Sequence, residues 1–247
     1  MMRITNSQIT SLMHNSMNAS SAELGKLMQQ MATSKRILLP SDDPIASVRV
    51  LRVQREEASL EQFRKNIANV SGSLSTQEAN LKSTSDAMLN VRDLLLWAAN
   101  GSNTSEDLSA MAGELSIIED TIFSFANVRD EEGRYLFSGT LSDTPALAFD
   151  AATQTYSITG NDKHRQAAVA NGVLVDENVT ATSVFGAGVG MLNELRGLIN
   201  TLQDPALDAT DPAVRQQITD TLGALDDAHG RVLGSVTELG GRQNALS

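Results

Sequence analysis

The sequence has 247 residues, of which 41% are hydrophobic and only 4% aromatic, and it carries a net charge of −11. This acidity argues against a nucleic-acid partner, because DNA and RNA are bound through Lys and Arg side chains that meet phosphates. The lack of cysteine excludes disulfides and thiolate metal sites, and no apolar run approaches the ~20 residues of a membrane span.

The first predicted element is a helix over residues 6–34, and nothing before it resembles the apolar core of a secretory signal peptide. Its apolar positions alternate by four and three, with Ser20 as the one polar member, which is coiled-coil spacing. Met repacks easily and suits neighbours that are not quite equivalent, although a simple role as a helix former explains the methionines equally well. We predict an assembly interface formed by Met13, Met17, Leu24, Leu27 and Met31.

A proline at position 40 interrupts this helix, because the residue before proline is driven out of the α region. Asp43 is a good N-cap and Pro44 a favourable first helical residue. A long helix is therefore predicted from Pro44 to about Ala99.

The apolar seam of this long helix is the strongest signal in the sequence. Its positions follow one another at spacings of three and four for more than five heptads, and only Gln77 and Thr84 are polar. The seam comprises Leu60, Phe63, Ile67, Val70, Leu74, Gln77, Leu81, Thr84, Met88, Val91, Leu95 and Ala98. It requires partner helices, and similar heptads over 108–125 and 218–239 supply them, so we expect an intramolecular bundle. An ordinary buried helix of a globular domain is the alternative.

The rest of the chain predicts a third helix that ends before residue 131, a β-rich stretch, and two further helices. Residues 140–186 contain short strand patterns, with Asn171-Gly172 as a hairpin turn. The stretch 180–185 is a further strand candidate. The fold class is thus mainly α: an elongated bundle of long heptad-patterned helices with a small β-rich insertion domain at its tip. The predicted domains are 1–40, a body of 41–139 and 187–247, and the insertion 140–186.

No arrangement of side chains predicts catalysis. The three histidines lack metal-ligand spacing, and His229 on the last seam is expected to be a packed, hydrogen-bonded residue. Asp42 and Asp43 suit a helix cap better than acid–base chemistry. The glycine-rich stretch 185–190 lacks the Gly-Lys-Ser/Thr ending of a phosphate loop and reads as a hinge. We therefore expect no metal, no cofactor and no enzymatic activity.

Several short motifs occur in the order typical of the flagellin family. They are Ser41-Asp42-Asp43-Pro44, Asn66-Ile67-Ala68-Asn69, Tyr135-Leu136-Phe137-Ser138-Gly139 and Leu239-Gly240-Gly241-Arg242-Gln243-Asn244. Each motif is modest alone, but the ordered set resembles this family over nearly the whole chain, least in 140–186. The first and third motifs resemble the family's hook–filament junction branch more than its filament flagellins.

The resemblance implies a structural subunit that is exported unfolded and assembles by helix packing. The implied partners are other copies of the chain, neighbouring hook-associated and flagellin subunits, and an export chaperone as a further candidate. The implied location is outside the cell, in the bacterial flagellum at the hook–filament junction. Residues 1–40 are implied to serve axial assembly.

Members of the family continue past the Gln-Asn motif into a final helix that pairs with the N-terminal one, whereas this sequence ends at Ser247. We accordingly expect residues 1–40 to be loosely held in solution. Two other functions stay open at this point: a minor filament flagellin, and a helical binding or chaperone-like module.

Overall fold

The computed structural model describes residues 6–246, and the chain divides into two units, Met1–Glu61 and Gln62–Ser247. The first unit contains helix α1 (Asn6–Thr33) and the beginning of helix α2 (Pro44–Ala98). Both helices were predicted within one or two residues of these bounds.

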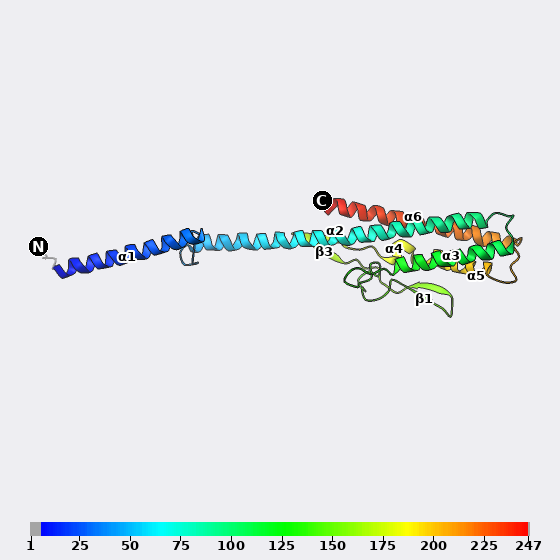
Figure 1. Ribbon diagram of the computed structural model, residues 1–247, viewed down its shortest axis with the longest axis horizontal. Helices are drawn as coiled ribbons and strands as arrows, with labels where there is room; N and C mark the ends of the chain where they lie inside the picture. Colours follow the sequence, from blue (N-terminus) through cyan, green and yellow to red (C-terminus); the bar gives the residue numbers. More distant parts are fainter. Residues whose placement is uncertain (1–5, 247) are drawn as a thin grey trace. The chain divides into compact units, whose positions relative to one another are not determined.

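Helices run side by side in the second unit, residues 62–247, which we call the body from here on (Figure 1). They are the later part of α2, α3 (Ser105–Ala126), α5 (Gly190–Leu202) and α6 (Pro212–Leu246). Thr104 begins α3 with a capping box, because its side chain accepts from the Asp107 amide and the Asp107 carboxylate accepts from the Thr104 amide. The expected bundle of helices from one chain is confirmed.

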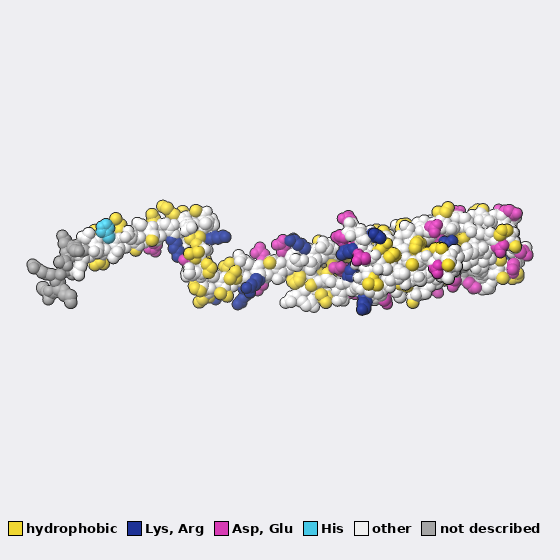
Figure 2. Space-filling view, turned by 90° about the horizontal axis from the view of Figure 1, so that it is seen from below, with side chains coloured by type: hydrophobic (Ala, Val, Ile, Leu, Met, Phe, Trp, Pro, Cys, Tyr) yellow, Lys and Arg dark blue, Asp and Glu magenta, His cyan; other side chains and the backbone are white. Residues whose placement is uncertain are grey.

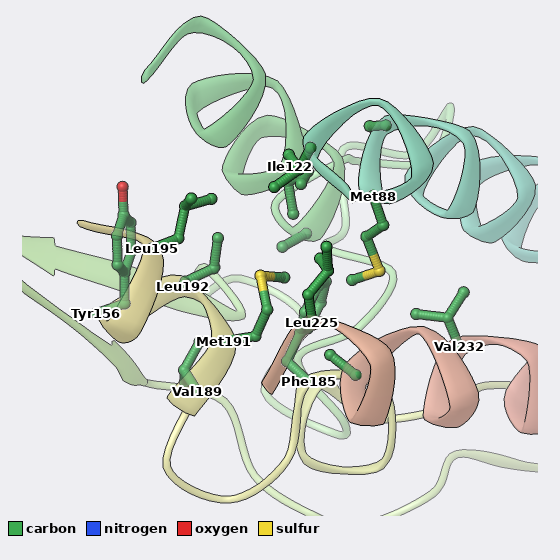
Figure 3. Packing of buried hydrophobic residues seen from close by; sticks show 14 of the residues in the cluster. Met88, Ile122, Tyr156, Phe185, Val189, Met191, Leu192, Leu195, Leu225 and Val232 are labelled. Atoms are coloured by element: carbon green, nitrogen blue, oxygen red, sulfur yellow. The ribbon is translucent and has the colours of Figure 1, made fainter. Parts of the chain in front are cut away.

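The seam of α2 is the core of the body from Val70 onward, where every seam position to Ala98 is buried. Met88 of α2 meets Ile122 of α3 and Leu225 of α6 (Figure 3). The seam prediction was too long at its N-terminal end, because the Leu60 side chain is 62% exposed. Periodicity identifies the face of a helix but not how far the partner helices reach.

The β-rich insertion consists of two antiparallel hairpins. Strands β1 (Leu147–Asp150) and β2 (Thr155–Ile158) form one, and β3 (Gln166–Ala170) and β4 (Val173–Asp176) form the other. The predicted turn at residues 171–172 joins β3 to β4. Both hairpins contact body helices, the second through Asn66 of α2 and the first through Asn193 of α5.

The strand expected over residues 180–185 is instead a short helix, α4 (Ala181–Phe185). Alternating β-branched residues favoured a strand. Thr180 and Ser183 form a capping box that starts a helical turn, and Val184 and Phe185 are buried in the core. Side-chain capping and burial therefore outweighed local strand preference.

The turn into α5 holds Val189 in the left-handed region, with φ 48° and ψ 37°. This conformation is unfavourable for a β-branched residue. The Val189 side chain is only 1% exposed and lies among core residues of α4 and α5 (Figure 3). Its burial offsets the strain and fixes the start of α5.

Candidate assembly surfaces and the contacts that frame them

The predicted interface on α1 is exposed along its whole length. Figure 2 shows hydrophobic side chains on the surface of this helix. The exposed fractions are 69% for Met13, 66% for Met17, 57% for Leu24, 52% for Leu27 and 82% for Met31. Ile9, Leu12 and Met28 widen the same apolar surface, which the sequence analysis did not include. Large apolar side chains in such density indicate a surface that a partner covers.

The turn between α1 and α2 is organised by the Ser-Asp-Asp-Pro motif. Asp42 accepts from the Lys26 ammonium at 2.8 Å and from the amides of Leu38 and Leu39. Asp43 accepts from the Ala46 amide at 3.0 Å, which caps α2 as predicted. Hydrogen bonds from Lys26 to Asp42 and from the Ala46 amide to Asp43 hold the pKa values of both carboxyls below their usual range. Ser41 is exposed beside them.

Gln77, one of the two polar residues of the seam, is hydrogen-bonded to the segment between β4 and α4. Its side-chain nitrogen donates to the Glu177 carbonyl at 2.8 Å, and its side-chain oxygen accepts from the Val179 amide at 3.0 Å. The side chain is fully buried. Gln77 therefore satisfies two backbone groups that lie outside the strands and helices.

Asn66 and Asn69 of the second motif lie about three and two helical turns before Gln77 on α2. The Asn66 amide donates to the Ala168 carbonyl of β3 at 2.7 Å. Asn69 is exposed and lines a polar cleft of about 540 Å³ between α2 and the turn that follows α3. Only the first of the two therefore joins α2 to the insertion.

The last motif joins α6 to both α2 and the insertion. Gln243 donates to the Glu78 carboxylate at 3.1 Å. Arg242, which was not singled out as a site residue, donates to the Asn178 carbonyl at 2.9 Å. Asn244 follows in the last turns of α6. His229 of the same helix is hydrogen-bonded to Ser85 of α2 at 2.8 Å, as expected of a packed histidine.

The Tyr135–Gly139 motif forms a buried crossing of two loops. The Tyr135 hydroxyl accepts from Arg129, whose guanidinium also lies 4.3 Å from the ring centroid. Phe137 is 1% exposed, and its carbonyl accepts from the Ala181 amide. Gly139 has φ +72°, and a Cβ there would lie 2.2 Å from the Asn161 carbonyl oxygen. Glycine is required at this position because two backbones touch.

Two asparagines that the sequence analysis missed cover the outer edges of the first hairpin. Asn127 at the end of α3 exchanges two hydrogen bonds of 3.0 Å with the backbone N–H and C=O of Leu147. Asn193 of α5 pairs in the same way with the backbone of Tyr156. Each side chain imitates a neighbouring strand, so neither edge of the hairpin is left open at these points.

A buried ion pair, also missed, connects α3, α5 and β2. The Arg196 Nε donates to one Glu119 oxygen at 3.0 Å, and its Nη2 lies 2.6 Å from the other. Arg196 also donates to the Tyr156 hydroxyl and lies 5.1 Å from the Phe149 ring centroid. Burial raises the pKa of Glu119 to about 7, and the opposing charge of Arg196 only partly offsets it.

Glu119→Gln is expected to flatten the pH dependence of the free energy of unfolding between about pH 4.5 and pH 7. The folded chain keeps the Glu119 proton to about pH 7, whereas the ordinary pKa is 4.5. The folded state thus binds more protons in this window, and its stability falls as pH rises, by up to about 3 kcal/mol for this group. Urea unfolding of both proteins across the window measures the difference.

Asp120→Asn is the matched control for this experiment. Asp120 adjoins Glu119 and lies 3.9 Å from Arg196, but its side chain is 73% exposed. The Asp120 charge also raises the pKa of Glu119, but less than burial does, so we expect the Asp120→Asn protein to keep most of the pH slope of the unchanged protein. An unaltered slope in the Glu119→Gln protein would contradict the assignment.

Among the residues that the structure describes, no group of three or more His, Asp or Glu side chains is placed to hold a metal ion. Within residues 6–246, none of the helices combines the length and the apolar character that crossing a bilayer demands.

A family model for the bacterial flagellin N-terminal helical region matches residues 4–142. The chain belongs to the flagellin family. Within this family it is similar to flagellar hook-associated protein 3 of Salmonella typhimurium, with 34% identity over 137 residues, which are 56% of this chain and 43% of that protein. It is also similar to the B-type flagellin of Pseudomonas aeruginosa, with 26% identity over 62% of this chain and 32% of that flagellin.

Solved structures of flagellin-family proteins share the fold. One from Vibrio parahaemolyticus, assigned as a flagellar hook-associated protein, has a TM-score of 0.76 and 41% identity, covering 84% of this chain and 91% of that one. The junction protein FlgL of Legionella pneumophila has a TM-score of 0.69 at 16% identity, covering 80% and 99%. The expected family and the mainly α fold are thus confirmed. The chain spans about two fifths of the Salmonella relative's length.

Proposed function

We propose that this chain is a structural subunit of the bacterial flagellum that joins the hook to the filament. It acts outside the cell, without a catalytic step, by packing its helices against other copies and against neighbouring hook-associated and flagellin subunits. Its similarity to hook-associated relatives supports the place in the flagellum. The exposed apolar surface of α1 supports the mode of assembly, because its large apolar side chains follow heptad spacing and are uncovered.

Deletion of the gene tests the place in the flagellum. A strain without a junction subunit is expected to build hooks without filaments and to release unpolymerised flagellin into the medium. Electron microscopy and immunoblotting of the medium measure the two effects. Intact filaments on the deletion strain would contradict the junction role and favour a minor filament flagellin.

The double variant Met17→Ser/Leu24→Ser tests the α1 interface in the same strain. Burial of one such side chain contributes about 1.5–3 kcal/mol, so the variant is expected to leave most cells without filaments. Asn18→Ser/Gln29→Ser changes two exposed polar residues of the same helix and is expected to restore filaments. Equal restoration by both variants would show that assembly does not use this face.

A further inference from the structure

Helix α2 carries an exposed stripe near its beginning that combines apolar and basic residues. Its members follow at spacings of three, four and three, so they share one side of the helix. We call it the basic stripe: Ile45, Val48, Arg52 and Arg55. The side chains of Ile45 and Val48 are 71% and 60% exposed. Within residues 6–246, no ion pair involves Arg52 or Arg55.

A second exposed stripe lies further along the same helix and has the same spacings of three, four and three. We call it the acidic stripe: Asp86, Leu89, Asp93 and Leu96. Leu89 and Leu96 are 41% and 52% exposed, and Trp97 beside them is 62% exposed. The opposite side of this helix segment is buried in the core of the body. In the described part of the chain neither aspartate forms an ion pair.

The charge of the body decides what kind of partner the acidic stripe accepts. Residues 62–247 contain twelve Lys and Arg against twenty-four Asp and Glu, whereas residues 1–61 contain seven against six. Figure 2 shows the acidic side chains spread over the body. Two bodies therefore repel each other, and a contact on the acidic stripe requires a basic partner. The basic stripe has the charge and the apolar residues that this partner needs.

We propose that the basic stripe of one copy packs against the acidic stripe of a second copy. Arg52 and Arg55 then meet Asp86 and Asp93, while the apolar members of the two stripes exclude water between the helices. The contact joins two different surfaces, so it repeats head to tail from one copy to the next. This inference rests on the proposed function, because a repeating contact between copies is what an axial structure uses.

Sedimentation velocity of the full chain at low and high ionic strength tests the contact. The unchanged protein is expected to self-associate at low ionic strength and to dissociate as salt screens the charges. Arg52→Gln/Arg55→Gln and Asp86→Asn/Asp93→Asn are each expected to weaken association at least about tenfold. A mixture of the two variants keeps one complementary pair of stripes, so it is expected to form one-to-one dimers and nothing larger.

Glu114→Gln/Asp227→Asn is the control, because it removes two exposed carboxylates outside the acidic stripe. It is expected to associate like the unchanged protein. A chain that stays monomeric at low ionic strength, or stripe variants that associate normally, would overturn the proposal. Neither result would alter the deletion phenotype, so failure of this contact is distinguishable from failure of the junction role.

Discussion

Gly139→Ala is expected to destabilise the body by about 2–5 kcal/mol, more than any other exchange of glycine for alanine that we propose. Two effects add at this position. The backbone is left-handed, with φ +72°, and the new methyl group would lie 2.2 Å from both the carbonyl and side-chain oxygens of Asn161. Asn161 cannot withdraw freely, because its amide group binds the backbone and hydroxyl of Thr140. Urea unfolding followed by circular dichroism measures the loss.

Gly133→Ala separates the two effects. Gly133 also has a left-handed backbone, with φ +80°, but its Cβ would meet nothing within 4 Å. We expect it to destabilise the protein by only about 1–2 kcal/mol, the conformational part alone. If the two variants lost equal stability, the close approach of the two loops would not matter to the fold.

Gln77→Met is expected to destabilise the body by about 2–4 kcal/mol, although it places an apolar residue of similar size in an apolar seam. The exchange leaves the Val179 amide without its acceptor. It also removes the Gln77 side-chain donor from the Glu177 carbonyl, which keeps only the longer hydrogen bond from Ser73 at 3.4 Å. Val179 is 1% exposed, so water cannot replace the lost bond in the folded state. Hydrogen exchange of the Val179 amide is expected to accelerate together with the loss of stability.

Thr84→Val is the matched control, since Thr84 is the other polar residue of the seam. Its hydroxyl donates only to the Asn80 carbonyl, one turn earlier on the same helix. Removing the hydroxyl leaves no backbone group without a hydrogen-bond partner, so the change in stability is expected to stay within about 1 kcal/mol. A Gln77→Met protein as stable as this control would rule out a structural role for the buried amide.

The long helices were predictable because the heptad spacing of apolar residues repeats many times along each of them. The seam of α2 and the Asp43-Pro44 start are local patterns, and the structure agrees with both. The partners of polar residues carry no comparable signal. Gln77 binds a segment 102 residues away, and Glu119 meets Arg196 across 77 residues. Such contacts depend on how the helices and loops are placed in space.

The residues of the candidate surfaces divide in the same way. The apolar residues of α1, such as Met13 and Met17, could be proposed as an interface from their heptad spacing. The spacing does not show whether they are buried within the chain or exposed, because both kinds of seam have the same sequence pattern. Their exposure emerged only with the structure. The acidic stripe of α2 was hidden by the stronger seam on the opposite side of the same segment, and the basic stripe precedes that seam. One helix can thus carry a face that packs in the core and a second face proposed to contact another copy. Apolar periodicity identifies the core face, because that face has the longer run of apolar residues.

The amide pairs of Asn127 and Asn193 have a consequence for the order of folding. The first hairpin has two strands of four residues, too few to be stable alone in water. Its edges are completed by side chains from α3 on one side and α5 on the other, 20 and 37 residues away. The hairpin therefore becomes stable only after α5 has formed and packed against it. Its formation belongs to the last cooperative step of the body rather than to an early local event.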